Sequence, residues 1–340
     1  MARHSLTHPP GVVLTRTPLR VSFAGGGTDL SDFYERDYGA VLSTAIDKYI
    51  YVTVKRHGEV FDEKVRLNYS KSESVATVDE VENNIARECL RFLQIEPPIY
   101  ISTVGDLPAS TGLGGSSSFA VGLLNALHAF RGERVSAGQL ADEACHIEIE
   151  VLKEPIGKQD QYAAAFGGMN FLRFNPGGGV TVEPVRVKYV TLRSMFSHFM
   201  IFWIGHQRDA SHVLSEQKAN TASKMDHLLL MRDHAHRVHS LLSNGHFDLE
   251  GFGAVLDETW RLKRGLARTI SNAKIDGLYE KAMTAGASGG KICGAGGGGF
   301  LLIVAKPERQ EAVRHALQDL KEVPISYETQ GSQVMLPFID

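Results

Sequence analysis

Glycines and hydroxyl residues are concentrated in one short stretch of the chain, Pro108 to Ser118, which reads PASTGLGGSSS. The apolar residues that follow, as far as Phe130, recur at helical spacing, so the stretch is expected to end at a helix N-terminus. Such a junction presents unpaired backbone N–H groups and the positive end of the helix dipole, and phosphates bind there. The stretch therefore predicts a nucleotide-phosphate site. Its expected residues are Pro108, Gly112, Leu113, Gly114, Gly115, Ser116, Ser117 and Ser118.

Three other glycine motifs do not fit this stretch. A P-loop needs a lysine before its hydroxyl residue, but Ser116 follows Gly115 directly. A dinucleotide-binding fingerprint needs a third glycine at a set offset, and that glycine is absent. A protein-kinase glycine loop is accompanied by HRD and DFG segments, which the chain lacks. The remaining alternative is an ordinary glycine-rich connection with a serine at the helix N-cap.

Acidic residues further along the chain could complete a centre for phosphoryl transfer. That reaction needs a held triphosphate, a metal ion to spread its charge, and a group that positions or deprotonates the acceptor hydroxyl. Mg²⁺ keeps several waters, so the Ser116 hydroxyl and one carboxylate, Glu148 or Glu150, suffice as protein ligands. Asp160, within GKQDQY, is the candidate base or orienting group; its alternative role is the N-cap of a short helix.

The overall composition argues against several classes of protein. A length of 340 residues favours two domains, and a net charge of −3 provides no basic surface for nucleic acid or an anionic membrane. No apolar run is long enough to span a membrane, and no signal-peptide core is visible. The odd number of widely spaced cysteines fits neither a disulfide framework nor a zinc motif and indicates the cytoplasm. The sequence allows a homodimer. His234, His236 and His239 lack the spacing of a zinc site and are expected on an exposed helix face.

The periodicity of apolar residues predicts an α+β architecture that positions these groups. Expected strands cover residues 14–23, 41–46, 50–55, 65–69, 99–104, 169–174, 199–204 and 300–304. Expected helices cover residues 78–93, 116–131, 137–152, 160–166, 211–244, 247–266 and 307–320. Both halves place a glycine loop among strands and helices, which favours α+β over a doubly wound sheet. We expect a domain boundary near residue 190.

Three segments together resemble the GHMP kinase superfamily, named for galactokinase, homoserine kinase, mevalonate kinase and phosphomevalonate kinase. They are residues 17–29 (TPLRVSFAGGGTD), residues 108–118 and residues 290–300 (GKICGAGGGGF), and they occur in the family's order. One departure is that Gly115 stands where the family loop has its first serine, while Ser116 keeps the second. The resemblance spans nearly the whole chain.

The resemblance implies a two-domain fold, an activity and roles for individual residues. The expected domains are residues 1–190, similar to domain 2 of ribosomal protein S5, and residues 191–340, similar to ferredoxin. The implied activity is ATP-dependent and needs Mg²⁺. Arg20 matches the family arginine that faces the catalytic aspartate, here Asp160, and the transferred phosphate. In the galactokinase branch the metal glutamate stands twelve residues before that aspartate, which favours Glu148 with Ser116 as metal ligands.

The acceptor implied by the resemblance is a sugar. Asp29 matches the aspartate that binds sugar hydroxyls in galactokinase, whereas Gly26 and Gly27 replace its Glu-His pair and are expected to leave space for a larger sugar. The segment most resembles the heptose 7-phosphate kinases, which phosphorylate the anomeric hydroxyl on the route to GDP-heptose. The alternatives are another sugar-1-kinase, such as a fucokinase or galactokinase, and a non-catalytic sensor. The expected substrate-binding residues are Asp29, Thr28, Gly26, Gly27, Lys158, Arg208, Gly296 and Gly297, with Arg56 as a further candidate for the acceptor's phosphate.

Overall fold

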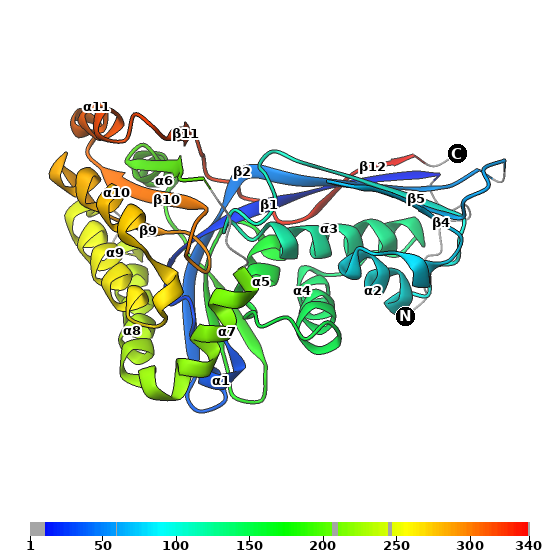
Figure 1. The fold of residues 1–340 in the computed structure, drawn as a ribbon, viewed down its shortest axis with the longest axis horizontal. Helices are drawn as coiled ribbons and strands as arrows, with labels where there is room; N and C mark the ends of the chain where they lie inside the picture. The colour runs from blue at the N-terminus through cyan, green and yellow to red at the C-terminus, as the bar shows by residue number, and fades with distance from the viewer. Residues whose placement is uncertain (1–10, 59, 206–209, 244–246, 339–340) are drawn as a thin grey trace.

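The chain folds into two sheets with helices packed against them (Figure 1). The computed structural model describes residues 11–58, 60–205, 210–243 and 247–338. An eight-stranded sheet belongs mainly to the first half of the chain, and a four-stranded sheet belongs to the second half. The expected mixed architecture with two units is therefore confirmed.

The large sheet has the strand order β12-β1-β2-β5-β3-β4, with β6 and β7 attached to β2. Its strands are β1 (Val12–Ala24), β2 (Gly39–Arg56), β3 (Val65–Asn68), β4 (Ser72–Val75), β5 (Ile99–Gly105), β6 (Met169–Phe174), β7 (Val180–Pro184) and β12 (Gln333–Phe338). The two strands expected over 41–46 and 50–55 are one strand, β2. The register between β1 and β2 shifts at Pro18/Leu19, and this bulge absorbs the polar pair Asp47 and Lys48 that interrupts the apolar pattern.

The helices of the first half place the groups expected to react. They are α1 (Ser31–Tyr34), α2 (Asn84–Phe92), α3 (Gly115–Phe130), α4 (Ala137–Cys145) and α5 (Gln159–Phe166), with a 3₁₀ turn at Val78–Glu80. The helix expected from residue 78 begins only at Asn84, because the Asn83 side chain caps it by accepting from the Ala86 amide. The helix expected over 137–152 becomes a π-helical turn at His146–Val151. Such turns shift the register of the side chains and often occur at functional sites.

The small sheet has the order β11-β8-β10-β9. Its strands are β8 (Phe199–Trp203), β9 (Ala287–Ile292), β10 (Phe300–Ala305) and β11 (Lys321–Val323); its helices are α6 (Tyr189–Phe196), α7 (Ala210–Asn220), α8 (Met225–Ser243), α9 (Leu249–Arg264), α10 (Ala273–Thr284) and α11 (Pro307–Ala316). The single helix expected over 211–244 is two helices, α7 and α8, which are separated by a 3₁₀ turn at Thr221–Lys224. A second 3₁₀ turn, Arg268–Ile270, follows α9. Strand β9 was not expected, because its ASGGKI sequence lacks an apolar pattern.

Glycines let α9 lie directly on β9. A Cβ atom at Gly289 would come within 2.0 Å of the Gly253 carbonyl oxygen, and one at Gly253 within 2.5 Å of the Ser288 carbonyl oxygen. No side chain fits there, so the helix and strand backbones touch. This contact fixes α9 against the small sheet and directs its C-terminal end toward the segment that follows β9.

Aromatic packing joins the two units. Phe23 of β1 contacts Phe199 of β8 and Phe252 of α9, with ring centroids 5.5 and 5.2 Å apart. The final strand, β12, returns to the large sheet and pairs with β1, as Figure 1 shows. The boundary at residue 190 stays a prediction. In the described part of the chain, none of the helices combines the length and apolar character that a membrane crossing requires.

Candidate active site

A close ion pair forms the centre of the site. Arg20, on β1, is 4% exposed; its Nε lies 2.7 Å from Asp160 Oδ1 and its Nη2 lies 2.6 Å from Asp160 Oδ2. Asp160 is in the first turn of α5, 140 residues further along the chain. The remaining Arg20 nitrogen, Nη1, donates to the Gly112 carbonyl oxygen at 2.8 Å. The pair therefore joins the start of α5 to the glycine-rich loop, and its bidentate geometry fixes the direction of the carboxylate.

The glycine-rich loop ends at the N-terminus of α3, as its composition predicted. Gly112 and Gly114 have φ of +81° and +80°, the left-handed region that glycine adopts without strain. A Cβ atom at Gly112 would lie 2.5 Å from the Cys293 carbonyl oxygen, and one at Gly114 would lie 3.5 Å from Asp160 Oδ2. The loop is thus packed between the segment after β9 and the ion pair. Leu113 is buried beneath it, and Pro108 is exposed at its start.

The three serines at the start of α3 face different surroundings. Ser116 is exposed, and its Oγ donates to Glu148 Oε1 at 2.8 Å. Ser117 is buried on the same side and also hydrogen-bonds the Glu148 carboxylate. Ser118 is turned inward, where its hydroxyl donates to the Pro18 carbonyl oxygen at 2.8 Å. The structure does not support Ser118 as a phosphate contact, because its hydroxyl and its backbone amide both have hydrogen-bond partners within the fold.

Glu148 is a carboxylate without solvent contact. It lies in the π-helical turn, is 0% exposed, and accepts from Gln161 Nε2 at 2.7 Å. Burial raises the pKa of Glu148 to about 7, against the opposing effect of the hydrogen bonds from Ser116, Ser117 and Gln161. Glu150, the alternative considered from the sequence, is an exposed residue that pairs with His146 at 2.7 Å. Only Glu148 of the two adjoins the glycine-rich loop.

The oxygen atoms around Glu148 fit a magnesium ion. The Ser116 hydroxyl lies beside the carboxylate, and Gln161 Oε1 is buried without a hydrogen-bond partner in the described structure. All three groups are hard oxygen donors, and a cation there offsets the cost of burying the carboxylate. In the described residues no three His, Cys, Asp or Glu side chains gather as a metal cluster. A site with few protein ligands suits Mg²⁺, which retains several waters.

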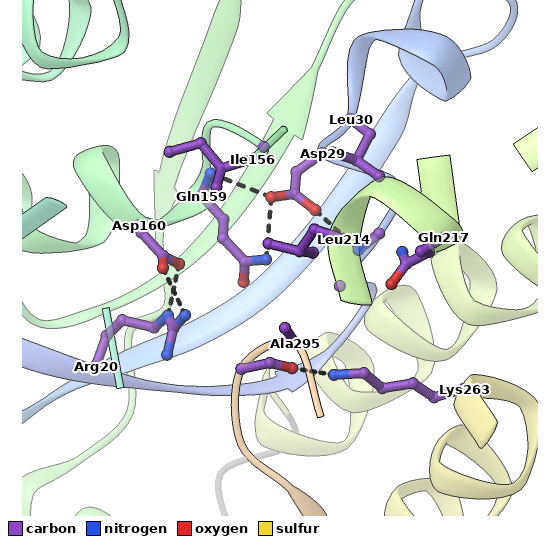
Figure 2. Close-up of a pocket in the computed structure, with 14 residues that line it drawn as sticks. Arg20, Asp29, Leu30, Ile156, Gln159, Asp160, Leu214, Gln217, Lys263 and Ala295 are labelled. Atoms are coloured by element: carbon purple, nitrogen blue, oxygen red, sulfur yellow. Dashed lines mark hydrogen bonds and ion pairs between the residues drawn. The ribbon is translucent and has the colours of Figure 1, made fainter. Parts of the chain in front are cut away.

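A polar pocket lies between the ion pair and the second unit. Figure 2 shows Asp29 at one side of this pocket, with Arg20 and Asp160 at another and residues of α7 and α9 facing them. Asp29 Oδ1 accepts from the Gly27 amide at 2.8 Å, and its Oδ2 accepts from Gln159 Nε2 at 3.0 Å. Gln159 Oε1 is buried and has no hydrogen-bond partner in the described structure. The pocket therefore offers a carboxylate and a free amide oxygen, both of which accept hydrogen bonds from hydroxyl groups.

The segment before Asp29 differs from expectation at two residues, Gly27 and Thr28. Gly26 lines the pocket, and a Cβ atom there would make ordinary contacts, 3.7 Å from Gln159 Nε2 and 3.9 Å from Ser22 Oγ. The space beside Gly27 is filled, because a Cβ atom there would lie 2.4 Å from Gln217 Nε2 of α7. The prediction that Gly27 leaves room for a larger sugar is therefore wrong. Thr28 faces away from the pocket: its hydroxyl donates to the Gly25 carbonyl oxygen at 2.8 Å and accepts from the Ala40 amide, which holds the turn together.

Of the cations expected to bind an acceptor phosphate, Lys158 and Arg56 are not among the residues that line the pocket. Lys158 Nζ donates to the Gly178 carbonyl oxygen at 2.7 Å and lies 5.6 Å from the Tyr34 ring centroid. Arg56 stacks on Phe130, at the opposite end of α3 from the glycine-rich loop, which places it about 20 Å away at 1.5 Å per helical residue. Arg208 lies outside the described residues.

The second glycine run, 294–299, contacts the pocket at different residues from those expected. Gly294 and Ala295 line the pocket. The Gly297 amide donates to the Ile270 carbonyl oxygen at 2.8 Å, and a Cβ atom at Gly296 would lie 2.8 Å from that same oxygen. Gly296 and Gly297 therefore fix the loop to the Arg268–Ile270 turn, and the part of the loop that lines the pocket is its beginning.

The pocket residues that were not anticipated from the sequence include two polar side chains of the second unit, Gln217 of α7 and Lys263 of α9. No motif marks either of them. Lys263 does carry a signal: it continues the buried stripe of α9, eleven residues after Phe252 and seven after Leu256. A lysine on the apolar face of an amphipathic helix is unusual and indicates a buried partner or ligand. The histidines were also misjudged in part, since His234 is buried and lies 2.9 Å from the Thr259 hydroxyl.

Comparison with known proteins identifies the family. The profile of the GHMP kinases N terminal domain matches residues 76–168, and that of the GHMP kinases C terminal domain matches residues 239–322, which together cover about half of the chain. The chain belongs to the GHMP kinase superfamily. The kinases of this superfamily use ATP as phosphate donor, which agrees with a phosphate loop at the N-terminus of α3.

Several relatives of this GHMP kinase align over nearly their whole length. A D-glycero-alpha-D-manno-heptose 7-phosphate kinase of Campylobacter jejuni is 28% identical over 317 residues, which are 90% of this chain and 93% of the relative. A galactokinase of Pyrococcus furiosus is 22% identical over 90% of this chain and 92% of its own. Among solved structures, a D-glycero-D-manno-heptose 1-phosphate kinase from Bacteroides thetaiotaomicron superposes with a TM-score of 0.78 at 26% identity, covering 95% of this chain and 99% of that one. The two-domain GHMP kinase fold is thereby confirmed.

Proposed function

We propose that this ATP-dependent sugar kinase phosphorylates the anomeric hydroxyl of D-glycero-α-D-manno-heptose 7-phosphate, giving the 1,7-bisphosphate during GDP-heptose and surface polysaccharide synthesis. The observation that carries the proposal is the Arg20–Asp160 pair, which lies between the glycine-rich loop and the polar pocket. A phosphate donor held by the loop and an acceptor held in the pocket meet at that pair. The named relatives from Campylobacter jejuni and Bacteroides thetaiotaomicron support a heptose phosphate as the acceptor.

Each residue of the centre has a distinct role in this mechanism. Asp160 accepts a hydrogen bond from the acceptor hydroxyl and orients it for transfer. Arg20 holds the Asp160 carboxylate through two hydrogen bonds and stabilises the negative charge that develops during transfer. Asp29 and Gln159 accept hydrogen bonds from ring hydroxyls and so fix the sugar's position. The backbone amides at the start of α3 hold the phosphates of ATP.

Glu148 and Ser116 would hold Mg²⁺, which when bound neutralises charge on the phosphate oxygens. The pocket that would receive the acceptor is lined by residues of both units, residues 1–190 and 191–340. We place the enzyme in the cytoplasm, where ATP and sugar phosphates are available. The protein has no role in nucleic-acid binding in this proposal.

An ADP-release assay with Mg-ATP and a panel of sugars and sugar phosphates tests the function. The proposal requires turnover with heptose 7-phosphate and a new anomeric phosphate signal in the phosphorus NMR spectrum of the product. Turnover of free fucose or galactose in preference to heptose 7-phosphate favours the other sugar-1-kinases of the family. Binding of ATP and sugar without any turnover identifies a sensor; the contacts of Arg20 with Asp160 and of Ser116 with Glu148 argue against that outcome.

A further inference from the structure

An acceptor that already carries a phosphate needs a cation in its pocket, and the pocket offers two in the described structure. Its lining includes the basic side chains Arg20 and Lys263. All three Arg20 nitrogens donate within the fold, two of them to Asp160 and one to the Gly112 carbonyl oxygen. Arg20 is therefore committed to the reacting centre. Lys263 is the cation that remains for the acceptor.

Lys263 is buried but only partly satisfied. Its side chain belongs to the buried face of α9, and its Nζ donates to the Gly294 carbonyl oxygen. An ammonium group has three N–H donors, and the described structure gives Lys263 this one hydrogen bond and no carboxylate partner. Burial lowers the pKa of Lys263 to about 8, which reflects the cost of keeping an unpaired charge there. A bound anion would offset that cost.

The position of Lys263 suits the far end of the acceptor. Figure 2 shows Lys263 and Gln217 on the side of the pocket away from Asp160 and Arg20. The anomeric hydroxyl must lie beside Asp160, so the opposite end of a sugar phosphate is directed toward α7 and α9. Both helices belong to the second unit, whereas Arg20, Asp29 and Asp160 belong to the first.

We propose that Lys263 binds the phosphate group that the acceptor carries before the reaction and so makes the enzyme specific for phosphorylated sugars. This proposal rests on the function proposed above. On binding, the Nζ group shares its hydrogen bonds between the Gly294 carbonyl and the phosphate oxygens. The acceptor's phosphate is thereby tied to the loop that begins at Gly294 and packs on Gly112, which links the acceptor to the nucleotide side of the site.

A purely structural role is the competing explanation for the burial of Lys263, and Lys291 is a lysine with such a role. Lys291 of β9 is also buried, and its Nζ donates to the carbonyl oxygens of Ser22 and Phe23 at 2.7 and 3.3 Å. It ties β9 to β1 and is absent from the pocket lining. Lys291 is therefore a matched control: a buried lysine in the same region that holds backbone but does not face the acceptor.

The test compares two acceptors that differ only by the phosphate, D-glycero-D-manno-heptose and its 7-phosphate, in the full-length protein. Lys263→Met keeps the length of the side chain and removes the charge. We expect kcat/KM for the 7-phosphate to fall by roughly 10- to 100-fold, the range for a hydrogen bond to a charged group, mostly through KM. The rate with the unphosphorylated heptose should stay within about threefold. Lys263→Arg should recover part of the preference for the phosphate, and Lys291→Met should affect both acceptors equally.

An equal loss on both acceptors with Lys263→Met overturns the inference, and so does an unchanged preference for the phosphate. If Lys263→Met does not fold, Lys263→Arg and Lys263→Gln provide the same ratio, and melting temperatures show which variants are folded. Failure of the inference is distinguishable from failure of the proposed function. Wild-type turnover of the heptose 7-phosphate without a Lys263 effect removes only the inference. If the wild type uses neither heptose, the heptose assignment fails, and mannose and mannose 6-phosphate form the second pair of probes for Lys263.

Discussion

Replacing Glu148 with glutamine should make the protein more stable and less active. The side chain is 0% exposed, and burial raises the pKa of its carboxyl to about 7. Glu148→Gln keeps the shape and removes the charge. The new amide can donate to Gln161 Oε1, a buried acceptor that has no partner in the described structure, if the Gln161 amide turns over. The substitution therefore replaces a buried charge with a hydrogen bond between two side-chain amides.

The pKa of Glu148 sets the size and the sign of the change in stability expected for Glu148→Gln. In the metal-free protein the folded-state pKa lies near 7 and the ordinary value is 4.5, so folding favours the protonated form. The wild type consequently loses stability as the pH rises from about 4.5 to about 7, after which the loss is constant. At about 1.4 kcal/mol for each pKa unit, the cost at pH 8 is about 3 kcal/mol. Glu148→Gln should recover a large part of it, and the gain should vanish near pH 4.5.

Urea unfolding in EDTA at pH 5 and pH 8 measures the stability, and a Mg²⁺ titration of ATP turnover measures the function. Glu150→Gln is the matched control, because Glu150 is exposed and two residues away. The control should change stability by less than about 0.5 kcal/mol and leave the Mg²⁺ titration unchanged. The reasoning is refuted if Glu148→Gln is less stable than the wild type at pH 8, or if its Mg²⁺ dependence matches that of the wild type.

Three further predictions follow from the geometry. Asp160→Asn should lower kcat by about 10²- to 10⁴-fold while the affinity for ADP, measured by calorimetry, changes little; a kcat near that of the wild type would exclude Asp160 from the chemistry. Gly27→Ala should raise the KM for the acceptor several-fold, because the new Cβ meets Gln217 Nε2 at 2.4 Å and φ is +101°; an unchanged KM would mean that α7 yields without affecting the pocket. His128 is buried between Glu143 and Glu133, and although burial lowers its pKa, hydrogen bonds to both carboxylates produce a net rise. The stability that the protonated His128 contributes is present at low pH and is lost as the pH rises through its folded-state pKa. His128→Gln should therefore destabilise the protein by about 1 kcal/mol at pH 6 and by less at pH 9. Urea unfolding that shows a larger loss at pH 9 than at pH 6 contradicts this prediction.

The first half of the site was largely readable from the sequence, because its residues lie within local motifs. A glycine-rich stretch before an apolar helical pattern predicts a phosphate loop, and Gly112 and Gly114 adopt the left-handed backbone that such a loop requires. The elements that carry Arg20 and Asp160 were also predicted, since alternating and helical periodicity are local properties. Their pairing came from the resemblance to the family, because nothing local relates residues 140 positions apart.

The tertiary structure alone decided the other side of the pocket. Whether the absent side chain at Gly27 leaves a space depends on what packs there, and Gln217 of α7 fills it. Whether Lys158 or Lys263 lines the pocket depends on where each side chain packs: Lys158 donates to the Gly178 carbonyl oxygen, and Lys263 lies in the pocket lining. Sequence patterns fix the periodicity and capping of each element, but partners brought together by the packing of one unit on another are set by the whole fold. The sequence thus determined the glycine-rich loop and its helix, and tertiary packing determined which side chains line the pocket.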